Sequence, residues 1–325
     1  MSATQRAPEA VPTAASTAAA SAAEAERAGW CASARLQFSA SGGITRHQGG
    51  ASAPLKLMRA FPQSSGHCEL PLLHTAGGLV GGDQLSLEAR LEPSSRALLT
   101  SVAAQKVYGS VRRSRCHPQG RWAQQTIQFD LEPGSDLEWL PQELVLYADA
   151  LYEQNLRVNL ADHASFLAME VVRLGRTAAG EALGAGQWRS SLQIRRPSRW
   201  ELVDRLQLGG EALEGEHGMA GEPVFGSLVW AAPQPLSAES LEQLLNAART
   251  ARAGLEGTMA CGALEQGLVA RYRGPSSQAA RFWFCRLWAL IRQARGLESP
   301  QLPRVWPFQE QPWAAAAPAA PECSG

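Results

Sequence analysis

The feature that most constrains the fold is a unit of strand, turn and strand that occurs three times between residues 87 and 170. Apolar and polar side chains alternate within each unit, a period that is typical of a strand with one buried face. Proline, glycine, serine or aspartate occupy the turns, and each favours a tight reversal for its own conformational reason. The units begin at Leu87, Ile127 and Leu156, and their turns lie at 92–95, 132–135 and 161–164.

This repeat predicts a mainly β protein built from layered, stacked antiparallel sheets. Repeated units with turns at similar offsets suit a sandwich or a short solenoid, so both arrangements stay open. The alternation continues in Trp188–Ile194 and Trp200–Leu208, which predicts two further strands joined through 195–198. The 30 glycines and 20 prolines in 325 residues agree with a turn-rich β protein and exclude long helices over most of the chain.

Two helices are expected toward the C-terminus. Ser237 can cap a helix over Ala238–Arg252, whose apolar residues recur at helical spacing. The second helix, about Ser277–Arg295, carries an apolar band too wide for a one-sided surface helix, and Gly296 is placed to end it. This helix is therefore either buried on two sides within this protein, the interpretation that we favour, or in contact with a partner.

The sequence divides into one β-rich domain over residues 30–310 and two low-complexity tails. Residues 1–29 are rich in alanine and residues 311–325 in alanine and proline; such compositions bury too little to fold, so both tails are expected to be disordered. No run of about 18 apolar residues occurs, and the N-terminal stretch lacks the apolar core of a secretory signal. A membrane is not an expected partner.

Net charge and cysteine content indicate which partners and which cellular compartment to expect. Thirty basic and thirty acidic residues cancel to a formal net charge of zero, without a basic stripe suited to phosphates, so nucleic acid is not an expected partner either. The six cysteines are scattered and form no CxxC pair, which indicates reduced thiols in the cytoplasm.

No common catalytic or nucleotide-binding motif occurs, whether HExxH, GxSxG, GxxxxGK[ST] or GxGxxG. The glycine-rich run 77–83 resembles a phosphate cradle, but it leads into an alternating strand and offers no helix N-terminus to an anion. We interpret it as a tight loop in which glycines adopt positive φ and Asp83 accepts hydrogen bonds from loop amides.

Metal-binding patterns are weak. His67-Cys68 and Cys116-His117 are adjacent pairs, and neighbouring side chains of a strand point to opposite faces, so each pair is a poor chelate. Acidic residues are spread through the repeats and are expected mostly on solvated faces, although a few that line an internal cavity could pass a divalent cation. These acidic residues are Glu138, Glu143, Asp149, Glu153, Asp162 and Glu170.

Three sequence blocks, in order, carry a resemblance to a known family. Residues 73–83 (LHTAGGLVGGD) resemble the PGG[IL]VGGD signature of the UreD (UreH) urease accessory proteins. Residues 100–108 (TSVAAQKVY) resemble the TxPAATKxY segment of that family, and residues 138–143 (EWLPQE) resemble its EWLPQE segment. Ala76, Val102 and Gln105 depart from the Pro, Pro and Thr that the family usually has.

The resemblance implies a non-catalytic protein with layered β-sheets and helices toward the C-terminal part. By resemblance, it would bind UreF, which brings the GTPase UreG, and the assembly would dock on apo-urease to help insert nickel. No permanently bound cofactor is implied, since nickel would pass only transiently, through an internal passage for which Asp83, Glu143 and Glu170 are candidate carboxylates. The motif positions expected to serve structure or partner binding are Gly77, Gly78, Gly81, Gly82, Asp83, Lys106, Tyr108, Glu138, Trp139 and Glu143.

The alternative is an enzyme, such as a hydrolase, on a β scaffold. A lysine in a low-dielectric pocket beside a tyrosine can act as a base, so Asp83, Lys106 and Tyr108 would form its active site. The simpler interpretation, which we favour, is a structural ion pair between Lys106 and a carboxylate, for example that of Asp83 or Glu143.

Overall fold

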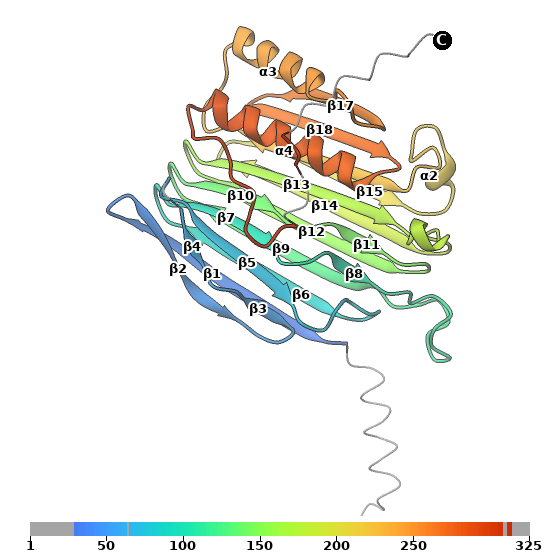
Figure 1. Ribbon diagram of the computed structural model, residues 1–325. Coiled ribbons are helices and arrows are strands. Elements are labelled where there is room, and N and C mark those ends of the chain that lie inside the picture. The colour runs from blue at the N-terminus through green and yellow to red at the C-terminus, as the bar shows by residue number, and fades with distance from the viewer. Residues whose placement is uncertain (1–28, 64, 308–310, 314–325) are drawn as a thin grey trace, which may run out of the picture.

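The computed structural model describes residues 29–63, 65–307 and 311–313 (Figure 1). The tails predicted to be disordered, 1–29 and 311–325, lie almost wholly outside these residues. Two β-sheets face each other, and helices cover the outer face of one of them (Figure 1). The mainly β class, the layered sheets and the helices toward the C-terminus are confirmed.

The first sheet, sheet A, has seven strands in the order β15-β14-β12-β9-β6-β1-β2. The bounds of its strands are β1 (Cys31–Ser41), β2 (Ile44–Ala51), β6 (Gln84–Leu91), β9 (Ala123–Leu131), β12 (Leu151–Leu160), β14 (Gln187–Arg196) and β15 (Arg199–Leu208). The last two are the predicted pair joined through 195–198.

The second sheet, sheet B, has eleven strands, eight of which follow the order β17-β18-β16-β13-β10-β7-β5-β3. The short strands β4, β8 and β11 pair beside this path. The bounds are β3 (Leu55–Leu57), β4 (Phe61–Pro62), β5 (Cys68–His74), β7 (Arg96–Ser101), β8 (Gln105–Val107), β10 (Asp136–Leu140), β11 (Leu144–Leu146), β13 (Ser165–Leu174), β16 (Val224–Ala231), β17 (Thr258–Leu264) and β18 (Gly267–Gly274).

The antiparallel pairing predicted for the repeats is wrong. Each unit leaves sheet A, turns a tight corner and continues in sheet B, so β6 and β7, β9 and β10, and β12 and β13 lie in opposite sheets. Successive units then stack in parallel, as in β6 with β9 and β7 with β10. Antiparallel pairs occur toward the sheet margins, for example between β14 and β15. The chain is therefore wound as a short solenoid whose two sheets form a sandwich.

Backbone hydrogen bonds between the corners explain why the units stack in register. The Ser94 amide donates to the Pro133 carbonyl at 3.1 Å, and the Gly134 amide donates to the Asp162 carbonyl at 3.0 Å. Neighbouring corners thereby pair their backbone amide and carbonyl groups by hydrogen bonds, as neighbouring strands do within a sheet. A four-residue turn between alternating strands fits this crossing between sheets as well as it fits a hairpin.

The core between the sheets comes from the predicted alternation. Side chains of β6 that alternate toward sheet B are almost fully buried, from Leu85 at 3% exposed to Leu91 at 0%. Large aromatic rings fill the space between the sheets, with the Phe129 ring centroid 5.6 Å from that of Trp139 and 6.0 Å from that of Phe166. Burial of this apolar surface is the main force that holds the layers together.

The two predicted helices are confirmed as α3 (Ala238–Thr250) and α4 (Ser277–Ala294). Ser237 caps α3 by accepting a hydrogen bond from the Ser240 amide, and Gly296 follows α4 with φ +66°. The wide apolar band of α4 packs on the outer face of sheet B and against α3, where Trp283 donates to the Ala248 carbonyl at 2.9 Å. This band is buried within the protein, as favoured from the sequence, so it offers little docking surface.

Two short helical turns, η1 (Thr177–Ala179) and α2 (Glu211–Glu214), lie in connections and were not predicted. After α4, the chain runs back over sheet B and buries Trp306, whose indole donates to Thr100 Oγ1 at 2.8 Å. Within the described residues, none of the helices is long and apolar enough to cross a membrane.

The two ends of the solenoid differ in character. One end carries the three tight corners at 92–95, 132–135 and 161–164. The opposite end, here called the loop end, carries the connections that precede β6, β9, β12 and β14 and that follow β15, most of which are longer than the corners. These connections are 75–83, 108–122, 147–150, 175–186 and 209–223. In Figure 1 they gather on the right-hand side of the molecule.

Candidate functional site at the loop end and in the cavity behind it

The glycine-rich run 77–83 forms the tight loop before β6. Gly77, Gly78 and Gly82 have φ values of +77°, +155° and +101°, in the region that disfavours other residues. A Cβ atom on Gly78 would lie 2.6 Å from the Tyr108 ring, and one on Gly82 would lie 2.4 Å from the Arg121 guanidinium. Gly81 lacks a positive φ, but its Cβ would lie 2.1 Å from Ser110 Oγ. The glycines thus allow β8 and the connection after it to approach closely.

Asp83 stabilises this loop as predicted. One carboxylate oxygen accepts a hydrogen bond from the Val80 amide at 2.8 Å, and the other accepts one from the Trp30 amide at 2.8 Å. The residue is only 3% exposed. Its carboxylate therefore fixes the loop against the start of β1 and is not among the groups that line the cavity described below.

Lys106 and Tyr108 lie beside the glycine loop but do not form an active site with Asp83. The Leu79 amide donates to the Lys106 carbonyl at 2.8 Å, and the Tyr108 hydroxyl donates to the Gly77 carbonyl at 3.3 Å. Lys106 is exposed. Among the described residues, no hydrogen bond or ion pair joins Asp83 to Lys106 or Tyr108. The geometry does not assemble the proposed hydrolase site.

The predicted ion pair of Lys106 with Asp83 or Glu143 is also wrong. Backbone amides occupy the Asp83 carboxylate, and Glu143 forms an ion pair with Arg281 of α4. Arg281 lies 138 residues beyond Glu143 in sequence, so local sequence offered no sign of this partner.

The EWLPQE segment anchors α4 on sheet B. Glu138 is 1% exposed and accepts hydrogen bonds at 2.9 Å from Arg292 Nη1 and from the Trp288 indole. Trp139, the next residue, points to the other face of the strand and packs in the core between the sheets. Glu138 and Glu143 thus hold two arginines of one helix, which explains both acidic positions of the segment without a catalytic role.

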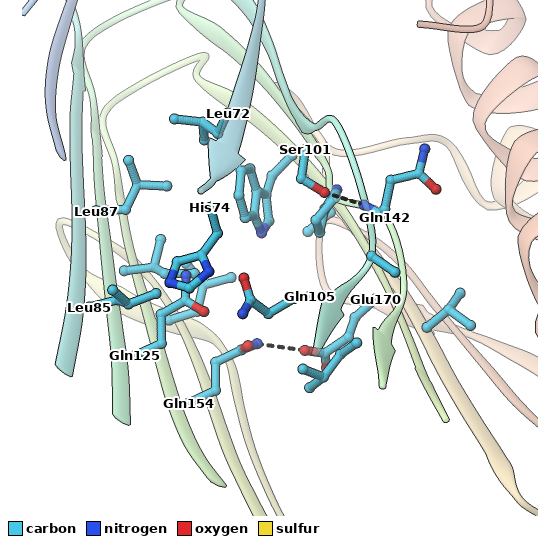
Figure 2. A pocket seen from close by; sticks show the side chains of 18 of the residues that line it. Leu72, His74, Leu85, Leu87, Ser101, Gln105, Gln125, Gln142, Gln154 and Glu170 are labelled. Atoms are coloured by element: carbon cyan, nitrogen blue, oxygen red, sulfur yellow. Dashed lines mark hydrogen bonds between the residues drawn. The ribbon is translucent and has the colours of Figure 1, made fainter. Parts of the chain in front are cut away.

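Behind the glycine loop, a cavity of about 250 Å³ lies between the two sheets (Figure 2). It separates the apolar core near the corners from the apolar core near the loop end. Leucines such as Leu72, Leu85 and Leu87 line part of its wall, while amide, hydroxyl, imidazole and carboxyl groups line the rest. Gly77, Gly78 and Lys106 also line it, so the cavity extends to the surface of the loop end.

Glu170 is the only acidic residue that lines this cavity among the described residues. Burial raises the pKa of its carboxyl to about 7, while a hydrogen bond from Gln154 and the charge of Arg271 act in the opposite direction. Gln154 Nε2 donates to Glu170 Oε1 at 2.5 Å (Figure 2). Burial therefore favours the protonated form of this carboxyl more strongly than water does. Of the three candidate passage carboxylates, only Glu170 faces the cavity, because Asp83 and Glu143 are engaged elsewhere.

Neutral polar groups surround this carboxyl. The Tyr152 hydroxyl donates to Gln125 Oε1 at 2.6 Å and lies 3.3 Å from Gln154 Oε1. The Gln154 amide nitrogen faces Glu170, to which it donates. His74 points among these side chains in Figure 2, and neither of its ring nitrogens has a hydrogen-bond partner among the described residues. Burial lowers the pKa of His74, which leaves a neutral imidazole with a free lone pair.

Four residues of the cavity wall were not predicted from the sequence: Gln125, Gln154, Tyr152 and His74. The available signal was an amide at an inward position of an otherwise apolar strand face, as for Gln125 between Ala123 and Ile127. Within the described residues, no three His, Cys, Asp or Glu side chains cluster as a metal site. The cavity thus offers one carboxyl and several neutral donors, a set that suits passage better than tight retention of a cation.

Comparison of the amino-acid sequence with known proteins identifies the family of this chain. The chain matches the family model described as UreD urease accessory protein over residues 31–307. It is 63% identical over 287 residues to the urease accessory protein UreD of Parasynechococcus marenigrum (strain WH8102), covering 87% of this chain and 92% of that protein. It is 64% identical over 275 residues to UreD of Synechococcus sp. (strain WH7805), covering 82% and 86%.

A more distant relative gives the same result. UreD of Prochlorococcus marinus (strain MIT 9313) is 61% identical over 272 residues, covering 82% of this chain and 85% of that protein. The fold and site therefore define a non-catalytic accessory protein built as a two-sheet β solenoid. The chain belongs to the UreD family of urease accessory proteins. This family membership, together with the position of Asp83, removes the hydrolase alternative.

Proposed function

We propose that the protein is a cytoplasmic scaffold for nickel insertion into apo-urease, and that it binds UreF and, through UreF, the GTPase UreG. The observation that carries this proposal is the family match over residues 31–307. The exposed connections at the loop end support it, because an assembly scaffold needs exposed surface for its partners. The sequence blocks 73–83 and 100–108 that resemble the family signature also meet at this end.

The cavity supports a role in nickel passage. When ionised, Glu170 supplies a single negative charge, and the side chains of Gln154, Gln125 and His74 supply neutral oxygen or nitrogen donors. A divalent cation held by one carboxylate and neutral groups is released more readily than one held by several anionic ligands. Nickel in this proposal is cargo, and no permanently bound cofactor is needed.

The test of this function is genetic. Deleting the gene is expected to abolish urease activation while the urease subunits are still made, and the intact gene is expected to restore it. Nickel content of the purified urease should fall together with its activity. Normal activation in the deletion strain, at ordinary nickel supply, would overturn the proposed function.

A further inference from the structure

The zero net charge of the chain conceals a separation of charge at the loop end. Residues 109–122, here called the basic loop, contain four arginines and no acidic residue, and Lys106 precedes them. Arg112, Arg113 and Arg115 are exposed. None of these three forms an ion pair within the part of the chain that the structure describes; Arg113 has only a longer-range electrostatic interaction with the Glu181 carboxylate.

The basic loop has a defined shape. The Arg112 amide donates to the Pro118 carbonyl at 2.8 Å, and the Arg121 amide donates to Ser110 Oγ at 2.7 Å. At the end of the loop, the Arg189 guanidinium lies 4.1 Å from the centre of the Trp122 ring. A surface that is already ordered loses less conformational entropy when it binds a partner.

A second segment at this end has the opposite charge. Residues 211–222, here called the acidic segment, contain four glutamates and neither lysine nor arginine. Glu211, Glu214 and Glu216 are exposed, and no ion pair involves them among the described residues. This segment is also fixed, because Met219 is 2% exposed and Arg273 donates to the Gly218 carbonyl at 2.8 Å.

Strand topology places the two segments at one end of the molecule. The basic loop leads into the first residue of β9, which is paired near the start of β12, and β12 starts beside the start of β14. The acidic segment leaves β15 at Leu208, which pairs with Trp188 at the start of β14. Three strand spacings separate β9 from β15, or about 14 Å. This exceeds the Debye length of about 8 Å at physiological salt, so neither segment neutralises the other.

We propose that the loop end is a bipolar docking face for a protein partner of reversed polarity. The partner would place an acidic patch against the basic loop and a basic patch against the acidic segment. Paired patches of opposite sign accelerate association and fix the orientation of the docked protein. A polyanion such as nucleic acid would meet repulsion from the acidic segment, which favours a protein. The inference rests on the proposed function, because the partner is one of the proteins named there.

Charge reversal tests the docking face. One variant carries Arg112→Glu, Arg113→Glu and Arg115→Glu, and a second carries Glu211→Lys, Glu214→Lys and Glu216→Lys. A matched control reverses three exposed arginines remote from the loop end, Arg46, Arg157 and Arg195, none of which lies in an ion pair among the described residues. Each protein is co-expressed with UreF, UreG and the urease subunits, and its affinity for UreF–UreG and for apo-urease is measured separately.

We expect both loop-end variants to lose about tenfold or more in affinity for the same partner, and the control to stay within about twofold. The affinity of the wild-type protein for that partner should also fall steeply as salt is raised, a measurement that needs no variant. Wild-type affinity in both loop-end variants, or a wild-type affinity that is independent of salt, overturns the docking face while the proposed function stands.

Two further outcomes distinguish a failure of the docking face from a failure of the proposed scaffold function. Failure of the wild-type protein to bind any of the named partners would count against the proposed function itself. A wild-type dimer that both reversals convert to monomer, with partner affinity unchanged, would assign the face to a second copy of this chain and overturn the proposal of a different partner.

Discussion

Replacing Glu138 by glutamine tests how α4 is held on sheet B. The Glu138 side chain is 1% exposed and that of Arg292 is 6% exposed, and Arg292 Nη1 lies 2.9 Å from each carboxylate oxygen. Glutamine preserves the shape of the side chain but removes its charge, so Arg292 stays buried without a counter-ion. Breaking such a buried pair from one side costs about 3–5 kcal/mol of folding free energy.

Urea unfolding followed by circular dichroism measures this loss. With a slope of about 3 kcal/mol per molar urea, the midpoint of Glu138→Gln should fall by about 1–2 M without a change in slope. The matched control is Glu132→Gln, which breaks an exposed pair with Arg90 at 2.7 Å and should cost only about 0–1 kcal/mol. A Glu138→Gln loss no larger than that of Glu132→Gln would refute the reasoning.

A double variant sharpens the interpretation. Glu138→Leu combined with Arg292→Met replaces the buried pair by apolar side chains of similar size, so that neither residue of the pair leaves an unpaired charge behind. We expect it to recover much of the stability lost by the single change, since a well-packed apolar pair often matches a buried ion pair.

Three further changes probe the loop, the cavity and the C-terminal segment. Gly78→Ala should lower stability by about 1–3 kcal/mol, because its φ is +155° and the new Cβ meets the neighbouring strand, whereas Gly50→Ala, with open space around it, should be nearly neutral in thermal unfolding. Glu170→Gln should leave partner binding intact but reduce urease activation, and it should flatten the pH dependence of stability. Trp306→Ala should cost about 3–5 kcal/mol in urea unfolding, whereas Trp313→Ala, at an exposed site, should cost little.

The pH prediction follows from the raised pKa of Glu170. A carboxyl whose pKa rises from 4.5 to about 7 on folding binds its proton more tightly in the native state. It therefore contributes stability below about pH 4.5 that is lost as the pH rises through 7, at most about 3 kcal/mol. Melting temperatures of wild type and Glu170→Gln between pH 4.5 and 8 should converge at low pH. Parallel curves would contradict the assignment.

Controls for the other two changes are also decisive. Equal melting temperatures for Gly78→Ala and Gly50→Ala would mean that the glycine loop is not packed as described. Equal urea midpoints for Trp306→Ala and Trp313→Ala would mean that the segment after α4 adds nothing to stability, contrary to the burial of Trp306.

Local sequence predicted the positions of strands and helices better than it predicted which strands pair with one another. The alternation at Leu85, Leu87 and Leu91 identified the inward face of β6, and Ser237 located the start of α3. Parallel stacking was missed because a short turn between alternating strands is compatible with both a hairpin and a crossing to a second sheet. Only the hydrogen bonds between corners, such as that from Ser94 to Pro133, distinguish the two.

In the candidate site, too, contacts between residues close in sequence were predicted, and contacts between distant residues were not. The glycine loop and the amide contacts of Asp83 lie within a few residues of one another, so sequence predicted them. The partner of Glu143 is Arg281, on an element far away in sequence, and the role assigned to Lys106 failed for that reason. Glu170 was one of several acidic candidates, and only the packing of the two sheets shows that it faces a cavity.

The central claim, a scaffold that assembles with the urease activation proteins, is tested most directly by co-purification. The chain is expressed with UreF, UreG and the urease subunits, captured through a tag on this chain, and passed over a size-exclusion column. The account predicts a stable complex that contains UreF. A lone monomer, under conditions in which UreF and UreG still pair, would contradict the account and would leave only the fold in common with the family.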